Sequence, residues 1–186
     1  MNKLLIGLIA LIVVIALPLV GAYNNLVTKS QTVDNSWAQV QTQYQRRFDL
    51  IPNLVNSVEG AMAQEREVFG ALATARTAYA GAQTPESQVA AATQVESALS
   101  RLLVIMENYP TLRSNENVTR LMDELAGTEN RIAVERSRYN DTVTDYNLTV
   151  SRFPGSLVAS LFAFSSKPLF TTTPGADQAP EVNISP

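Results

Sequence analysis

The stretch VTRLMDELAGTENRIAVERSRYNDTVTDYNLTVSRF, residues 118–153, carries a large apolar side chain at every seventh position. The members of this repeat are Val118, Leu125, Ile132, Tyr139, Tyr146 and Phe153. A seven-residue repeat keeps one seam of a helix facing a partner helix. The stretch therefore predicts a single helix of roughly 54 Å, at about 1.5 Å per residue, that ends at the Phe153-Pro154-Gly155 sequence.

Three earlier segments also carry apolar residues at every third or fourth position, which indicates amphipathic helices. The first stripe is Leu26, Val33, Trp37, Val40, Tyr44 and Phe48; the second is Val55, Val58, Met62, Phe69, Leu72 and Tyr79; the third is Ala92, Val95, Leu99, Leu102, Met106 and Tyr109. Thr84 and Pro85 suit the N-cap and first position of the third helix, and Pro110 closes it.

Four apolar stripes with short connections predict an all-α protein, in which residues 24–155 form an antiparallel four-helix bundle. Each stripe must be buried by the others. We therefore assign six aromatic residues to the core, namely Trp37, Tyr44, Phe69, Tyr79, Tyr139 and Tyr146.

Residues 1–23 contain LLIGLIALIVVIALPLVGA (Leu4–Ala22), nineteen residues without a charge. As a helix this run reaches roughly 28 Å, close to a hydrocarbon core of about 30 Å. It is either an uncleaved transmembrane anchor or a secretory signal cleaved after Val20-Gly21-Ala22. The anchor is favoured because the run exceeds the usual signal core of about 7–15 residues.

The orientation of the anchor is set by few charges. Lys3 favours a cytoplasmic N-terminus in the inner membrane and an extracytoplasmic bulk, although Lys29, Arg46 and Arg47 oppose this orientation.

The composition removes whole classes of function. The chain has 14 Lys and Arg against 17 Asp and Glu, a net charge of −3, which does not favour nucleic acid. It has no cysteine and no histidine, so thiolate metal sites and catalysis by Ser-His-Asp or Cys-His groups are excluded. Asp141 and Asp145 share a helix face but offer too few oxygens for a cation. We expect no catalytic residue, no cofactor and no metal.

The stretch QYQRRFDLIPNLV, residues 43–55, has two interpretations. Pro52 disfavours a helix interior, so the stretch predicts a helix end, a tight reversal and a new helix. Arg46 and Arg47 would then suit the end of one helix, and Asp49 the start of the next. Alternatively, this motif at a bundle end contacts another subunit or protein, through Arg46, Arg47, Asp49, Pro52 and Asn53.

Residues 156–170 open with SLVASLFAF (Ser156–Phe164), which is apolar but too short to span a bilayer. This segment caps the bundle, docks on a neighbouring subunit, or lies in the membrane interface. Capping or docking is favoured because it lacks the basic residues of an interfacial helix. Residues 171–186 predict a flexible tail.

Several motifs together resemble the LemA family of bacterial membrane-anchored proteins. They are YNNLV (23–27), SWAQVQTQYQRRFDLIPNLVNSVEG (36–60), TAR (74–76), ENYPTLRSNENVTRLMDEL (107–125), RYND (138–141), and YN (146–147) followed by FPGSLVASLFAF (153–164). The resemblance implies one N-terminal transmembrane helix, a helical bundle and no established enzymatic activity. It also implies genomic proximity to TPM-domain proteins or a membrane metalloprotease. SSKPLF (165–170) departs from the family pattern.

These observations predict a non-enzymatic, membrane-anchored scaffold or adaptor of the bacterial envelope. Because confinement to a membrane raises effective concentration, we also expect a homo-oligomer. Two alternatives are a membrane-remodelling coat and, less favoured, a hydrolase that uses carboxylates with Arg46 or Arg47.

Overall fold

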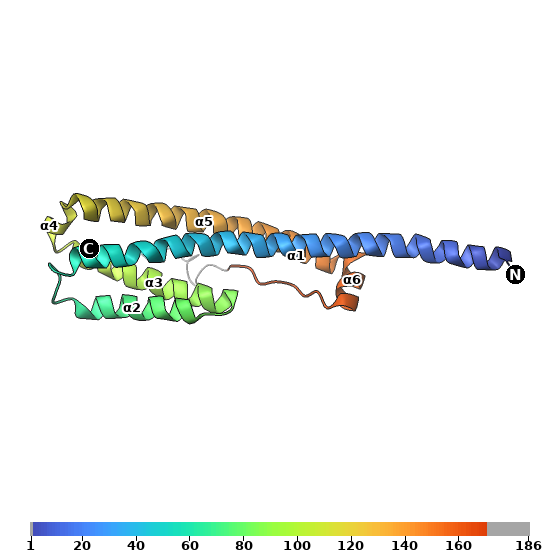
Figure 1. Ribbon diagram of the computed structural model, residues 1–186, viewed down its shortest axis with the longest axis horizontal. Helices are drawn as coiled ribbons and strands as arrows, with labels where there is room; N and C mark the ends of the chain where they lie inside the picture. Colours follow the sequence, from blue (N-terminus) through green and yellow to red (C-terminus); the bar gives the residue numbers. More distant parts are fainter. Residues whose placement is uncertain (1, 171–186) are drawn as a thin grey trace, which may run out of the picture. The chain divides into compact units, whose positions relative to one another are not determined.

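The computed structural model describes residues 2–170, and these residues form six helices and no strand. The helices are α1 (Asn2–Val58), α2 (Arg66–Gly81), α3 (Pro85–Met106), α4 (Pro110–Arg113), α5 (Glu116–Ser151) and α6 (Gly155–Phe162), shown in Figure 1. The all-α prediction, with an apolar helix at the N-terminus, is confirmed. The predicted tail, 171–186, lies outside the described residues.

The chain divides into two compact units. The described residues up to 33 and from 138 onward make one, called here the terminal unit. Residues 34–137 make the other, called the central unit. Helices α1 and α5 each contribute to both units.

The seven-residue repeat of α5 forms a buried seam, as predicted. Val118, Leu125 and Ile132 in the central unit, and Tyr139 and Tyr146 in the terminal unit, are each at most 4% exposed. Phe153 was wrongly included in this seam, because α5 ends at Ser151 and the Phe153 side chain is 82% exposed.

The start of α3 is also confirmed. Thr84 is its N-cap and forms a reciprocal capping box with Ser87, while Pro85 takes the first helical turn. These features satisfy the free N–H groups of the helix start locally, which is why short-range sequence identifies them. Buried residues of α3 include Ala92, Val95, Leu99, Leu102 and Met106.

The predicted reversal at Pro52 is wrong, because α1 continues through this residue to Val58. A proline in a helix interior costs about 3 kcal/mol relative to alanine. The buried stripe nevertheless runs on through Ile51, Leu54 and Val58, each at most 2% exposed. Each such side chain contributes about 1.5–3 kcal/mol on burial, and together they exceed the cost of the proline.

The helix ends are correspondingly displaced. The first turn follows Val58, α2 begins only at Arg66, and the last turn of α1 contains no basic residue. Arg46 and Arg47 therefore lie inside a helix and do not neutralise a helix end, as the reversal would require.

The aromatic core is confirmed only in part. Tyr44, Tyr139 and Tyr146 are buried, whereas Trp37, Phe69 and Tyr79 are half-buried. Tyr79 packs on Phe48, with ring centroids 4.3 Å apart, and burial raises its pKa to about 12.

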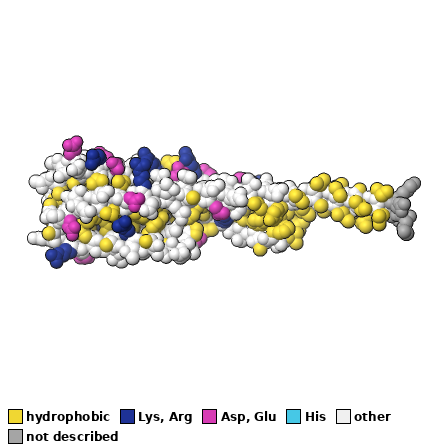
Figure 2. Space-filling view, in the orientation of Figure 1, with side chains coloured by type: hydrophobic (Ala, Val, Ile, Leu, Met, Phe, Trp, Pro, Cys, Tyr) yellow, Lys and Arg dark blue, Asp and Glu magenta, His cyan; other side chains and the backbone are white. Residues whose placement is uncertain are grey.

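The N-terminal part of α1 exposes its apolar side chains from Leu5 to Val20, and these cover the end of the helix in Figure 2. An 18-residue window there has a mean hydropathy of 2.9 and no buried residue. Helix α3 is also long and apolar enough to cross a membrane, with a mean hydropathy of 1.3. However, 39% of its apolar stretch is buried inside the protein, as in a core helix. The N-terminal part of α1 therefore fits a membrane anchor.

In helix α6, Val158 and Ala159 are buried, whereas Leu157 and Leu161 on another side, and Phe162 at the last position of the helix, are exposed. Each of these last three side chains is at least 45% exposed, and capping of the bundle by this segment stays a prediction. Docking on another subunit and insertion at the membrane interface stay open.

Replacing Pro52 provides a direct test of the continuous helix. Pro52→Ala should raise the free energy of unfolding by about 1–3 kcal/mol, because it removes the ring clash and restores a backbone donor. Circular dichroism monitors the denaturant-induced unfolding of the detergent-solubilised chain and gives this free energy.

Pro85→Ala is the matched control. Pro85 occupies the first turn of α3, where no hydrogen bond is lost through its missing N–H. The free energy of unfolding of this variant should therefore be unchanged or slightly lower. If both substitutions lowered stability equally, Pro52 would instead behave as a residue at a helix start.

Candidate functional site

The five residues of the predicted contact motif lie within two turns of α1 but do not share one environment. Arg46, Asp49 and Asn53 are exposed and follow each other at intervals of three and four residues, so they form one exposed stripe. Pro52 is half-buried and Arg47 is buried. The motif therefore consists of an outer and an inner part, and contact of the outer part with another protein stays a prediction.

Arg47 occupies a core position of α1. Residues 26, 33, 40, 47 and 54 follow at sevens, and the other four are Leu26, Val33, Val40 and Leu54, all with no more than 2% exposure. The Arg47 side chain is 8% exposed. A cation at such a position requires nearby carboxylates, because an unpaired buried charge is costly.

Two carboxylates from two other helices supply the negative charge that Arg47 requires. The Nη1 group of Arg47 forms an ion pair with Glu129 of α5 and lies 3.5 Å from Oε1 of Glu96 of α3. Arg47 of α1 thus joins three helices of the central unit.

A second arginine completes this cluster. Nη2 of Arg136 is 2.9 Å from Oε1 of Glu96, and its guanidinium also donates hydrogen bonds to the hydroxyl of Tyr44. Burial would lower the pKa of Arg136, but Tyr44, Glu96 and Glu129 outweigh it and raise that pKa. Burial also raises the pKa of Tyr44, so the hydroxyl remains a neutral acceptor.

The residues Arg47, Glu96, Glu129 and Arg136 are called here the Arg47 cluster. Its two cations and two anions balance in charge. The cluster therefore holds helices together and leaves no charge over for a ligand. A shift of one helix would separate these charges from their partners, and we interpret the cluster as favouring a single register of α1, α3 and α5.

A cleft of about 520 Å³ opens beside this cluster between α3 and α5. Its lining includes Arg47, Leu103 and Met122. Nε of Arg47 is buried and has no hydrogen-bond partner among the described residues.

A second polar arrangement holds the chain that follows α6. The side-chain amide of Asn147 donates to the backbone carbonyl of Lys167 and accepts from its N–H, both at 2.9 Å. Asn140 does the same for Phe170, at 3.0 and 2.8 Å. The hydroxyls of Tyr146 and Tyr139 donate to the carbonyls of Ser165 and Pro168. Residues 165–170, called here the strap, are therefore fastened along α5.

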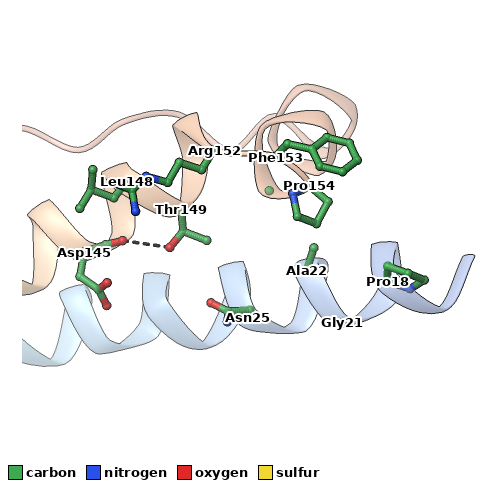
Figure 3. A pocket seen from close by; sticks show the side chains of 11 residues that line it. Pro18, Gly21, Ala22, Asn25, Asp145, Leu148, Thr149, Arg152, Phe153 and Pro154 are labelled. Atoms are coloured by element: carbon green, nitrogen blue, oxygen red, sulfur yellow. Dashed lines mark hydrogen bonds between the residues drawn. The ribbon is translucent and has the colours of Figure 1, made fainter. Parts of the chain in front are cut away.

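A cavity of about 340 Å³ lies between the end of the apolar span and the end of α5 (Figure 3). Pro18, Gly21, Ala22 and Asn25 line it from α1. Gly155 also lines it and must lack a side chain, because a Cβ there would lie 2.1 Å from the carbonyl oxygen of Thr149.

Sequence reasoning missed the partners of Arg47 and the role of the two asparagines. The signal for the asparagines was present, since the pair Tyr-Asn occurs at 139–140 and again at 146–147, one heptad apart.

The acidic side chains that the structure describes do not form a metal site. Asp145 pairs with Lys29. Among residues 2–170, no group of three or more acidic, histidine or cysteine side chains is placed to hold a metal ion.

The chain is similar to a family of known proteins. The model of the LemA family matches residues 36–184. Two magnetosome proteins of Paramagnetospirillum magneticum, MamQ 1 and MamQ 2, are each 26% identical over 181 residues, covering 83% of this chain and 66% of their own length. Magnetosome protein MamQ of Magnetospirillum gryphiswaldense is 32% identical over 81 residues, covering 44% of this chain and 30% of its own. The chain thus spans less than two thirds of these relatives.

The neighbouring arginines offer a matched pair for testing the cluster. Arg47→Met should lower the free energy of unfolding by about 1–3 kcal/mol, less than for a fully buried pair because Glu96 and Glu129 are partly exposed. Arg46→Met at the exposed neighbour should change it by less than about 0.5 kcal/mol. Denaturant unfolding of the detergent-solubilised chain measures both.

A third variant separates charge from packing. Combining Arg47→Met with Glu129→Gln removes the one surplus carboxylate, because Glu96 still pairs with Arg136, and should restore most of the lost stability. Equal stability of the two single arginine variants would show that the buried ion pairs contribute nothing.

The strap makes a residue-specific prediction for amide hydrogen exchange. Asn147→Ala should accelerate exchange of the Lys167 N–H by roughly tenfold, and leave the Phe170 N–H unchanged, because each amide has its own asparagine. Asn140→Ala should show the reverse. Simultaneous acceleration of both amides in either variant would mean that the strap detaches as one unit.

Proposed function

Since the chain belongs to the LemA family, we propose that it is a non-enzymatic scaffold or adaptor of the bacterial envelope, anchored by residues 1–23. The observation that carries this proposal is the continuity of α1. The same helix carries the exposed apolar residues from Leu5 to Val20 and, further along, Arg47 and the exposed stripe. An anchor joined without a break to a protein-binding surface confines that surface to one face of a membrane.

The proposed membrane is the cytoplasmic membrane, crossed once with the N-terminus inside and the bulk of the chain outside. Lys3 ahead of the apolar run supports this orientation. The binding part is an antiparallel four-helix bundle. Within the central unit, α2, α3 and α5 alternate in direction along the chain in Figure 1, which supports this arrangement.

A structural role is favoured over a catalytic one by the way the polar groups are used. The carboxylates of Glu96 and Glu129 are in ion pairs with arginines. Asp49 accepts a hydrogen bond from Gln45 on its own helix. The curated relatives, moreover, are named for a cellular structure, the magnetosome, and not for a reaction.

The proposed partners are a second copy of the chain and another envelope protein. TPM-domain proteins and a membrane metalloprotease are candidates for the latter. The exposed stripe of Arg46, Asp49 and Asn53 is the proposed contact surface, since its three side chains project from one face of α1.

A photo-cross-linking amino acid at Asn53 tests this surface in living cells. Cross-linked species should form several-fold more at Asn53 than at Asn130, an exposed asparagine on α5 that serves as the matched control. Mass spectrometry identifies whether the product contains a second copy or another protein. Equal yields at the two positions would remove the stripe as the contact surface.

The mass of the purified chain tests self-association separately. Analytical ultracentrifugation in detergent at micromolar concentration should give a protein mass above the 20.3 kDa of one chain. A single species at that mass would contradict the homo-oligomer. Electron microscopy of liposomes with added protein distinguishes a scaffold, which leaves their shape unchanged, from the alternative of a membrane-remodelling coat.

A further inference from the structure

Four large apolar side chains near α6 are exposed within the terminal unit. Their exposed fractions are 82% for Phe153, 67% for Leu161, 59% for Phe162 and 45% for Leu157. Val158 and Ala159 are buried on the side of α6 that faces away from Leu157 and Leu161, and Phe162, the last residue of the helix, lies on the same side as this buried pair. A short helix that turns an apolar face outward as well as inward is expected to have an apolar medium or partner on its outer side.

The apolar span of α1 gives a ruler for the position of these side chains. At about 1.5 Å per residue, the distance from Leu5 to Tyr23 along the helix is roughly 27 Å, close to the hydrocarbon thickness of about 30 Å. Tyr23 therefore marks the boundary between hydrocarbon and headgroups. Tyrosine is enriched at this boundary in membrane proteins.

The C-terminal end of α6 lies at this same boundary. The ring centroid of Phe162 is 4.8 Å from that of Tyr23, and the centroid of Phe164 is 5.9 Å from it. Phe153 shares the lining of the cavity in Figure 3 with Pro18 and Ala22, which belong to the last turns of the span.

The basic residues near α6 lie where a membrane surface would require them. Arg152 precedes α6 and is exposed. Lys167 follows it, and its Nζ lies 3.4 Å from the carbonyl oxygen of Ser30, about 10 Å beyond Tyr23 along α1. The cation is thus placed on the headgroup side. Basic residues beside α6 thus take the place of those that α6 itself lacks.

We infer that the exposed side of α6, formed by Leu157 and Leu161, inserts together with Phe153 into the same phospholipid bilayer that α1 crosses. The chain then contacts lipid at two places, a spanning helix and a short interfacial helix beside its exit. A bilayer is favoured over a second copy as the occupant because the face is level with, and adjoins, a segment already in lipid. The inference rests on the membrane anchor of the proposed function.

The absence of cysteine from the sequence makes a single-label experiment direct. The full chain carrying Leu161→Cys is labelled with a nitroxide and reconstituted into vesicles of phosphatidylcholine and phosphatidylglycerol. Electron paramagnetic resonance then measures collision with oxygen, which concentrates in lipid, and with a nickel chelate, which stays in water. Leu157→Cys repeats the measurement one turn away.

Two further positions calibrate the result. Leu11→Cys lies in the apolar span, and Val104→Cys is an exposed apolar position of α3. The oxygen-to-nickel ratio at Leu161 and Leu157 should be several-fold above that at Val104 and approach that at Leu11. Circular dichroism of each labelled chain verifies the fold.

Every other pattern overturns the inference, and each does so in a distinguishable way. High nickel access at Leu161 with high oxygen access at Leu11 places α6 in water while the anchor holds. Low access of both reagents at Leu161 places α6 against protein, as in docking on a second copy. High nickel access at Leu11 removes the anchor, and with it the proposed function.

Discussion

Arg47 occupies the one position in the seven-residue series of α1, from Leu26 to Leu54, that holds a charge. The cost of burying its guanidinium is met only while Glu96 of α3 and Glu129 of α5 lie within reach. Apolar side chains alone would tolerate a slip of one helix along another, because one aliphatic contact resembles the next. An ion pair does not, since a slip of one turn would move a carboxylate by about 5.4 Å.

The two adjacent arginines illustrate how a helix assigns opposite roles to neighbouring residues. Successive side chains on an α-helix point about 100° apart, so Arg46 faces solvent while Arg47 faces the core. The same sequence motif thereby contributes to folding through one residue and leaves the other available at the surface. The proposed contact surface therefore lies on the same turns of α1 as the Arg47 cluster.

Short-range and regularly repeated features of the fold could be predicted from the sequence. The seam of α5 and the cap at Thr84 depend on residues within one helix or one turn, and both are as expected, the seam from Val118 to Tyr146. Pro52 shows the limit, because its local penalty is visible in sequence while the burial that offsets it depends on other helices. The partners of Arg47 lie 49 and 82 residues away and follow no local pattern.

The strap has a consequence for how this part of the protein changes over evolutionary time. Asn140 and Asn147 hold main-chain groups, which every amino acid except proline provides in full. Substitutions other than proline at Lys167 or Phe170 therefore keep the hydrogen bonds to the two asparagines, and lose contacts of their own side chains, such as those with Tyr146 and Tyr139. Sequence variation is therefore expected at Lys167 and Phe170 more than at the two asparagines.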